Sequence, residues 1–250
     1  MISLKGKISI ITGGSRGIGA ATAVLLAKAG SDVAINYIEN GAKAENVVNC
    51  IKKLGRRVVT HRGDVGNAGV AKEFIEKTVS EFGRIDNVVN NAGIWTYLAM
   101  GSADEDNWGE TIQTNLTSVF NVTNAAVPYL KKEGGRIVNV ASTAGQRGEA
   151  FHSHYAASKG GILALTKSLA VELAPYKILV NAVAPGWVDT EMNSQVFIDQ
   201  KSRDIITQAI PLRKIATAED VAGSVLFLVS DLANHITGAT INVNGGSVLN

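Results

Sequence analysis

The feature of this sequence that most constrains the fold is an alternation of short apolar runs, rich in β-branched residues, with segments of helical period. Strands that alternate with helices form parallel βαβ units, because the helix between two strands returns the chain to the edge where the first strand began. The seven apolar runs are residues 7–12, 32–37, 57–61, 86–90, 136–141, 178–184 and 240–243.

We therefore expect an α/β fold of one domain over residues 1–250, in which a seven-stranded, doubly wound parallel sheet lies between two layers of helices. Ligands of such sheets bind beyond the carboxyl ends of the strands, so the chemistry is expected in the loops that follow strands. One connection, residues 187–211, is far longer than an ordinary loop and is predicted to be a lid over the substrate.

Charge and composition argue against several classes of partner. The 24 Lys and Arg residues nearly balance the 22 Asp and Glu residues, and the basic residues are scattered along the chain. This pattern gives no electrostatic case for nucleic acid or a membrane surface. The first residues lack the apolar core of a signal peptide, and no apolar run approaches the roughly 18 residues of a membrane span, so we expect a cytoplasmic protein. The single cysteine, Cys50, is expected to be buried or half-buried, without a redox role.

A glycine-rich stretch follows the first predicted strand. Gly13, Gly17 and Gly19 have the spacing G-x-x-x-G-x-G and open a predicted helix. Glycine lets the backbone approach a pyrophosphate closely, while the unpaired N–H groups and the dipole of the helix stabilise the anion. In this position the stretch indicates a dinucleotide site, although a tight turn with close helix–strand packing would use the same residues.

The end of the second predicted strand indicates which dinucleotide is bound. A carboxylate there usually accepts hydrogen bonds from the ribose of NAD(H), whereas this strand ends in Asn36 and Tyr37, followed by Ile38. With no carboxylate to repel a 2′-phosphate, and with Arg16 in the glycine-rich loop as a guanidinium clamp, NADP(H) is favoured. Glu39 is close enough in sequence that NAD(H) stays possible.

Ser142, Tyr155 and Lys159 supply the polar groups that acid–base chemistry needs. Tyr155 and Lys159 stand four residues apart, so they share one face of a predicted helix, and Ser142 follows the fifth predicted strand. A free tyrosine ionises at about pH 10, and we expect Lys159, together with the positive nicotinamide of an oxidised cofactor, to lower that pKa by about 1–3 units. Tyr155 would then exchange a proton with a substrate oxygen to which Ser142 donates a hydrogen bond.

Other chemistries fit the sequence less well. His152 and His154 stand two residues apart at a predicted helix start and do not face one another, and no cysteine or carboxylate completes a zinc pattern, so no metal site is expected. Ser142 lacks the flanking glycines of a nucleophile elbow, which disfavours an acyl-enzyme hydrolase. A nucleotide-sensing or scaffold protein with the same fold and no turnover is the alternative from another class.

Together these motifs resemble the short-chain dehydrogenase/reductase family, over essentially the whole chain and with its Rossmann-type fold. The resemblance implies an oxidoreductase that reduces a carbonyl to a secondary alcohol, or runs the reverse reaction. It also implies that Asn115 completes a relay with Ser142, Tyr155 and Lys159 by fixing a water that links Lys159 to solvent. The matching segments are residues 12–19, 64–65, 90–93 and 185–186, with Asn115, Ser142, Tyr155, Lys159 and Thr190.

The same resemblance implies a set of cofactor contacts. Asp64 and Val65 would hold the adenine, Asn91 and its neighbours would support the nucleotide ribose, and Thr190 with the Val188 backbone would hold the nicotinamide carboxamide. The full predicted set is Gly13, Ser15, Arg16, Gly17, Ile18, Gly19, Asn36, Tyr37, Asp64, Val65, Asn91, Ala92, Gly93, Tyr155, Lys159, Pro185, Gly186, Val188 and Thr190.

Within the family, the chain is similar to the 3-oxoacyl-[acyl-carrier-protein] reductase-like branch, through residues 12–19, 36–37 and 244–246. This similarity implies an acyl-carrier-linked substrate, whose acidic carrier could meet Lys131, Lys132 and Lys177. The segment 146–152 is equally compatible with an NAD(P)-dependent alcohol, sugar or steroid dehydrogenase. The family also implies a homotetramer, built on the two long helices that precede and contain the relay and on the carboxyl-terminal strand.

Substrate contacts are expected from loops above the relay. By position, the predicted contacts are Ser142, Trp95, Gln146, His152 and Trp187, with Tyr97, Glu149, Met192 and Phe197 as further candidates.

Overall fold

The structure, a computed structural model, describes residues 2–101 and 105–249. Its strands form a seven-stranded sheet in the order β3-β2-β1-β4-β5-β6-β7, and every neighbouring pair is parallel. The predicted sheet is confirmed, and each strand boundary lies within one residue of its apolar run. The strands are β1 (Ile8–Ile11), β2 (Asp32–Tyr37), β3 (Val58–Arg62), β4 (Asn87–Asn90), β5 (Gly135–Val140), β6 (Ile178–Pro185) and β7 (Thr240–Val243).

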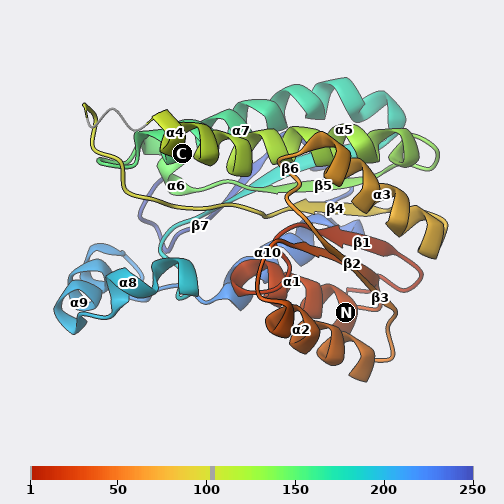
Figure 1. The fold of residues 1–250 in the computed structure, drawn as a ribbon, viewed down its shortest axis with the longest axis horizontal. Coiled ribbons are helices and arrows are strands. Elements are labelled where there is room, and N and C mark those ends of the chain that lie inside the picture. The colour runs from red at the N-terminus through yellow and green to blue at the C-terminus, as the bar shows by residue number, and fades with distance from the viewer. Residues whose placement is uncertain (1, 102–104, 250) are drawn as a thin grey trace.

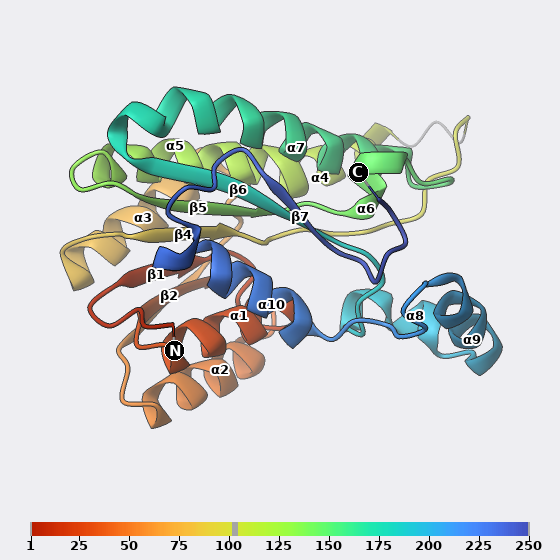
Figure 2. The same ribbon diagram turned by 180° about the vertical axis from the view of Figure 1, so that it is seen from behind.

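Helices cover both faces of the sheet, as Figures 1 and 2 show. One layer buries Leu26, Ile51 and Val225 against the sheet, and the other buries Phe74 and Leu130. Because both faces are covered, β1 and β4 are buried at every position, and the polar residues in them, Ser9, Asn87 and Asn90, are hydrogen-bonded. The first layer holds α1 (Gly17–Lys28), α2 (Gly41–Lys53) and α10 (Ala218–Leu228), and the second holds α3 (Ala68–Phe82), α4 (Glu105–Ile112), α5 (Ser118–Leu130) and α7 (Ser153–Leu173).

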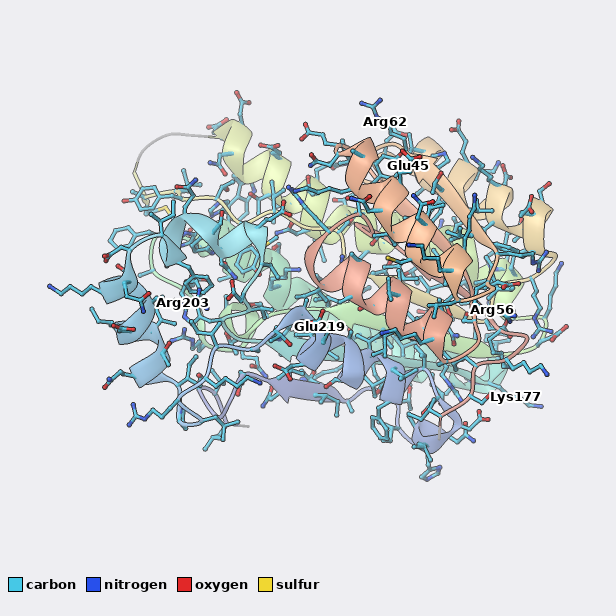
Figure 3. All side chains as sticks on the ribbon, turned by 90° about the horizontal axis from the view of Figure 1, so that it is seen from below. Glu45, Arg56, Arg62, Lys177, Arg203 and Glu219 are labelled. Atoms are coloured by element: carbon cyan, nitrogen blue, oxygen red, sulfur yellow. The ribbon has the colours of Figure 1, made fainter. Side chains whose placement is uncertain are left out.

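The segment 187–211 is helical rather than an open loop. It contains the 3₁₀ turn η3 (Glu191–Asn193), α8 (Ser194–Phe197) and α9 (Gln200–Ala209). Figures 1 and 2 place α8 and α9 beyond one end of the sheet, away from both helical layers. Arg203 of α9, labelled in Figure 3, pairs with Asp189 at 2.6 Å and so ties α9 to the start of the segment. Its role as a lid stays a prediction.

The remaining elements are short. They are the helix α6 (Thr143–Arg147), the π-helical turn η1 (Gln113–Thr117) and the 3₁₀ turns η2 (Ala174–Tyr176) and η4 (Asp231–Ala233).

Two surface properties follow from this arrangement. Figure 3 shows Arg62, Lys177 and Arg203 on separate parts of the molecule. Cys50 is exposed, so the expectation of a buried thiol was wrong: the buried face of α2 is set by Ala44, Val47 and Ile51, and Cys50 lies to one side of it. Over residues 2–101 and 105–249, the chain contains no helix with the length and apolar character needed to cross a bilayer.

Candidate active site

A cavity of about 740 Å³ lies beyond the carboxyl ends of β1, β4, β5 and β6. The sheet order reverses between β1 and β4, and this switch point leaves a crevice where the two halves of the sheet diverge. All the predicted cofactor residues except Gly19 border the cavity, and so do Ser142, Trp95 and Trp187. Residues from the ends of six strands, β1 to β6, and from helix α7 therefore meet at one site.

The glycine-rich loop can adopt its path only with glycine at several positions. Gly13 and Gly17 have φ of 63° and 52°, which side chains rarely adopt. Gly19 does not face the cavity; a Cβ there would overlap the carbonyl oxygen of Gly13 and lie 2.5 Å from Asn91 Nδ2. Gly19 thus permits the close packing of α1 against β1 and β4 that shapes the loop.

The amino terminus of α1 presents unpaired N–H groups to the cavity. Arg16 precedes the helix in an extended conformation, and within the described residues no side chain caps α1. Its first turn also carries no acidic residue. Backbone donors and the positive end of the helix dipole are thus open to an anion such as a pyrophosphate, so the loop fits the predicted dinucleotide.

Hydrogen bonds join the ends of β1 and β4. Asn91 donates its side-chain amide to the carbonyl oxygens of Thr12 and Gly13, at 2.9 and 3.2 Å. In return, the Thr12 hydroxyl accepts from the backbone N–H groups of Asn91 and Ala92, both at 2.9 Å. Asn91 is therefore bonded to the backbone of the glycine-rich loop, and its support of the nucleotide stays a prediction.

The opposite end of the cavity is formed by the ends of β2 and β3. The Asn36 amide donates to the carbonyl oxygens of His61 and Gly63, at 3.3 and 2.8 Å, so its donors are already used within the protein. Asp64 accepts from the backbone N–H of Gly66 at 2.8 Å and borders the cavity beside Val65. Glu39 and Asn40 line this end as well.

The predicted relay residues lie together where β5 ends. Ser142 precedes α6 and accepts a hydrogen bond from the backbone N–H of Ala144 at 3.1 Å. It also hydrogen-bonds Tyr155. Lys159 is buried one turn farther along α7, and its Nζ donates to the carbonyl oxygen of Val140 at 2.8 Å. The last residue of β5 therefore fixes the position of the ammonium group.

Burial dominates the electrostatics of this pair. It raises the pKa of Tyr155 to about 12, an effect that the nearby Glu149 charge increases and the Ser142 hydrogen bond opposes. Burial also lowers the pKa of Lys159 to about 8. In the protein alone, desolvation of the phenolate sets the direction of the Tyr155 pKa, and the lowering expected from Lys159 together with an oxidised nicotinamide stays a prediction. The Tyr155 phenol is therefore neutral at neutral pH.

Asn115 lies in the π-helical turn η1 and is fully buried. Its Oδ1 accepts from the backbone N–H of Ile94 at 2.7 Å, and its Nδ2 donates to Ile94 O at 2.9 Å and to Ser158 Oγ at 3.1 Å. A Cβ at Gly93 would lie 3.2 Å from Asn115 Oδ1 and 3.5 Å from Lys159 Nζ. Asn115 thus connects the loop after β4 to α7 beside the relay lysine.

Aromatic side chains cluster at one side of the cavity, where Trp95 and Trp187 border it. Trp95 stacks on His152 with ring centres 4.3 Å apart, and Trp187 meets Trp95 edge-on at 6.0 Å. Phe197 of α8 contacts Trp187 at 5.9 Å, and Tyr97 meets His152 edge-on at 6.0 Å. We call Trp95, Tyr97, His152, Trp187 and Phe197 the aromatic wall.

The structure divides the predicted substrate residues into two groups. Trp95, Trp187, Glu149, Met192 and Ser142 border the cavity. Tyr97, Gln146, His152 and Phe197 are not among the described residues that border it. Gln146 donates to Asn242 at 2.8 Å, and His152 supports Trp95 from behind. Their roles as substrate contacts stay predictions.

Sequence reasoning missed two charged residues. Glu191 borders the cavity and pairs with Lys43 of α2 at 2.6 Å and with Arg16 at 3.4 Å. No motif marks either residue, because the pair joins segments 148 positions apart. Within the part of the chain that the structure describes, no group of three His, Cys, Asp or Glu residues could hold a metal ion.

Comparison with known proteins identifies the family. A family model described as enoyl-(acyl carrier protein) reductase matches residues 13–248, nearly the whole chain. The chain belongs to the short-chain dehydrogenase/reductase family. It is therefore an oxidoreductase of the C=O/CH–OH class that uses a nicotinamide cofactor.

Curated relatives match over nearly their full length. The chain is 41% identical to the 3-oxoacyl-[acyl-carrier-protein] reductase FabG of Staphylococcus epidermidis, over 96% of this chain and 98% of that one. It is 40% identical to FabG of Thermotoga maritima, over 98% and 99%. A crystal structure from Sinorhizobium meliloti 1021, assigned to the short-chain alcohol dehydrogenases, superposes with a TM-score of 0.94 at 34% identity, covering 98% of this chain and 97% of that one. These relatives support a carbonyl-reducing enzyme.

Proposed function

We propose that this enzyme is an NADP(H)-dependent reductase of 3-oxoacyl thioesters, acting on a substrate attached to an acyl carrier protein. One observation carries the proposal: a neutral phenol, a buried lysine and an uncapped helix terminus border the same cavity. The names of the curated relatives supply the substrate class.

The residues of the cavity fit a nicotinamide dinucleotide. The α1 terminus would bind the pyrophosphate, Asp64 and Val65 the adenine, and Thr190 the nicotinamide carboxamide. Gly13, Gly17 and Gly93 border the cavity without a side chain, so a dinucleotide can approach their backbone closely. A Cβ at each would also lie within 3.4 Å of a neighbouring residue. When bound, the reduced nicotinamide supplies a hydride to the substrate carbonyl carbon.

The relay residues perform the proton chemistry. Tyr155 donates its proton to the carbonyl oxygen as the alcohol forms, and accepts one in the reverse direction. Ser142 donates a hydrogen bond to the same oxygen and stabilises its developing negative charge. Lys159 stabilises the phenolate that remains, because its ammonium group lies 5.7 Å from the Tyr155 ring centre. Asn115 joins the loop after β4 to α7, and a water that connects Lys159 to solvent would lie between them.

The cofactor preference rests on charge at the end of β2. Arg16 borders the cavity with its side chain 54% exposed, so it is accessible to a phosphate. The last residues of β2 carry no carboxylate, whereas Glu39 just beyond them favours NAD(H). Dissociation constants for NADPH and NADH in wild-type enzyme and in Arg16→Ala test this choice. An unchanged ratio would exclude the phosphate clamp.

A second candidate is an alcohol, sugar or steroid dehydrogenase, which the aromatic wall favours. Flat aromatic faces bind apolar or ring-shaped substrates as readily as an acyl chain. Oxidation of NADPH by a panel of 3-oxoacyl thioesters, cyclic ketones and sugars separates the two. Faster turnover of thioesters supports the proposal, and turnover restricted to ring ketones or sugars supports the second candidate. Cofactor binding without any turnover would favour a nucleotide-sensing protein.

The assembly is proposed to be a homotetramer. Three apolar side chains of the layer that holds α3, α4, α5 and α7 are exposed and support a subunit interface: Trp108 on α4, Phe120 on α5 and Val171 on α7. Sedimentation or light scattering measures the oligomeric state.

A cytoplasmic location also stays a prediction, which cell fractionation tests.

A further inference from the structure

Glu191 lies between two cations at the mouth of the cavity. Its Oε2 is 2.6 Å from Lys43 Nζ and 3.4 Å from Arg16 Nη1. Arg16 comes from the glycine-rich loop, Lys43 from the first turn of α2, and Glu191 from the turn that begins the segment 187–211. One carboxylate oxygen is thus shared by two positive side chains from the other half of the fold.

The position of this cluster matches the place where a phosphate on the adenosine ribose would lie. Arg16, Tyr37, Glu39 and Asn40 border the same cavity as Glu191, and Arg16 contacts it directly. Asn36, at the end of β2, uses its amide donors on two backbone carbonyls, so it offers no donor to a phosphate. Arg62 donates its Nε to the carbonyl oxygen of Ile38 at 3.1 Å, whereas Arg16 and Lys43 are both held by Glu191.

The start of α2 adds to the positive potential. Lys43 lies in the first turn of α2, which contains no acidic residue, and within the described residues no side chain caps this helix. The unpaired N–H groups of a helix start favour an anion. The side chains of Lys43 and Glu191 are 42% and 47% exposed, so their pairing is solvated and exchangeable.

We propose that Arg16 and Lys43 together form the binding site for the ribose 2′-phosphate, and that Glu191 is an intramolecular competitor that the phosphate displaces. This inference rests on the proposed NADP(H) preference and adds Lys43 and Glu191 as residues that determine specificity. A phosphate carries more negative charge than a carboxylate and three acceptor oxygens, so it can bind both cations at once. NAD(H) has no group that replaces Glu191.

Displacement of Glu191 also affects the neighbouring chain. Thr190 packs against the glycine-rich loop, since a Cβ at Gly17 would lie 3.4 Å from Thr190 Cγ2. The Glu191 ion pairs hold the next residue to Arg16 and Lys43. The phosphate therefore releases the segment 187–211 at its first turn, whereas NAD(H) leaves that connection in place.

The test uses a ligand without nicotinamide, so that it measures this site alone. Calorimetric titration compares adenosine 2′,5′-bisphosphate with adenosine 5′-monophosphate on wild-type enzyme, Glu191→Gln and Lys43→Met. Glu191→Gln keeps the size of the side chain and removes the charge. It is expected to bind the bisphosphate about two- to fivefold more tightly, with less change for the monophosphate. Lys43→Met is expected to bind the bisphosphate more weakly by a similar factor.

The matched control is Glu45→Gln, which removes an exposed carboxylate from the same helix. Glu45 is labelled in Figure 3. The Glu45→Gln substitution should leave the ratio of the bisphosphate and monophosphate affinities unchanged. A general effect of net charge would change that ratio in this control as well.

Three results of this titration would contradict the competition by Glu191 or the cofactor preference on which it rests. Equal weakening of both ligands in Glu191→Gln would show that Glu191 only holds the segment closed, and unchanged affinities would show that it does not compete; either result overturns the inference. A wild-type enzyme that prefers the monophosphate would instead contradict the proposed cofactor preference.

Discussion

The ammonium nitrogen of Lys159 lies 5.7 Å from the centre of the Tyr155 ring, one helical turn away on the same face of α7. Both groups are desolvated, so the pKa of Tyr155 rises to about 12 while that of Lys159 falls to about 8. The protein alone therefore holds a neutral phenol beside a lysine that loses its proton easily. This arrangement suits a proton donor, and it has a measurable cost in stability.

The pH dependence of stability should report the buried Lys159. Its pKa is about 8 in the folded protein and 10.5 as a model value, so between these values the unfolded chain binds more protons and stability rises with pH. Relative to Lys159→Met, the wild-type free energy of unfolding should rise by about 2 kcal/mol from pH 7 to 9.5. Denaturant titration at each pH measures it.

Lys167→Met is the control for that measurement. Lys167 is exposed two turns farther along α7, so its removal should leave a pH profile parallel to that of the wild type. A wild-type stability that stays level relative to Lys159→Met over this range would mean that the lysine is not desolvated.

Gly19→Ala should disrupt the site from a position outside the cavity. The new Cβ would overlap the Gly13 carbonyl oxygen, so β1 and α1 must separate at a cost of about 1–3 kcal/mol. Weaker cofactor binding should accompany the loss, because the loop path depends on this contact. Gly223→Ala, in the interior of α10 with open space around its Cβ, should instead stabilise by up to about 1 kcal/mol. Thermal melts and cofactor titration of both variants check this; normal melting of Gly19→Ala would contradict it.

Asn115→Ala should lower both stability and turnover. It leaves the backbone N–H of Ile94 without its buried acceptor, which costs about 1–3 kcal/mol. Turnover should fall further than stability explains, since the loop beside Lys159 loses its anchor. Asn124→Ala, on an exposed position of α5, should change stability by less than about 0.5 kcal/mol. Equal effects of the two substitutions in chemical denaturation would refute the anchoring role.

Trp95→Ala should weaken substrate binding and spare the cofactor. Removing the indole breaks its stacking on His152 and its edge contact with Trp187, each worth about 0.5–1.5 kcal/mol. The KM for the carbonyl substrate should therefore rise about tenfold, with the NADPH dissociation constant nearly unchanged. Leu54→Ala, at an exposed position just after α2, is the kinetic control. An unaltered KM in Trp95→Ala would remove the aromatic wall from the substrate site.

Much of this fold was predictable because the sheet is buried on both faces. Such strands are short apolar runs, and all seven were located to within one residue. The glycine loop and the i,i+4 pair of Tyr155 and Lys159 were predictable for another reason: their geometry is set by residues close in sequence.

Long-range and environmental properties were not predictable. The contact of Glu191 with Lys43 spans 148 residues and follows no motif. The pKa direction of Tyr155 in the protein alone depends on burial, which the sequence does not reveal. The exposure of Cys50 depended on which face of α2 packs against the sheet.

The most direct test of the account is the single-turnover rate of NADPH oxidation by Tyr155→Phe with a 3-oxoacyl thioester. The substitution removes only the hydroxyl group, so cofactor affinity should stay within about twofold of the wild type while the rate falls by about 10²–10⁴-fold. A variant that binds NADPH normally and reduces the thioester at the wild-type rate would show that Tyr155 is not the proton donor.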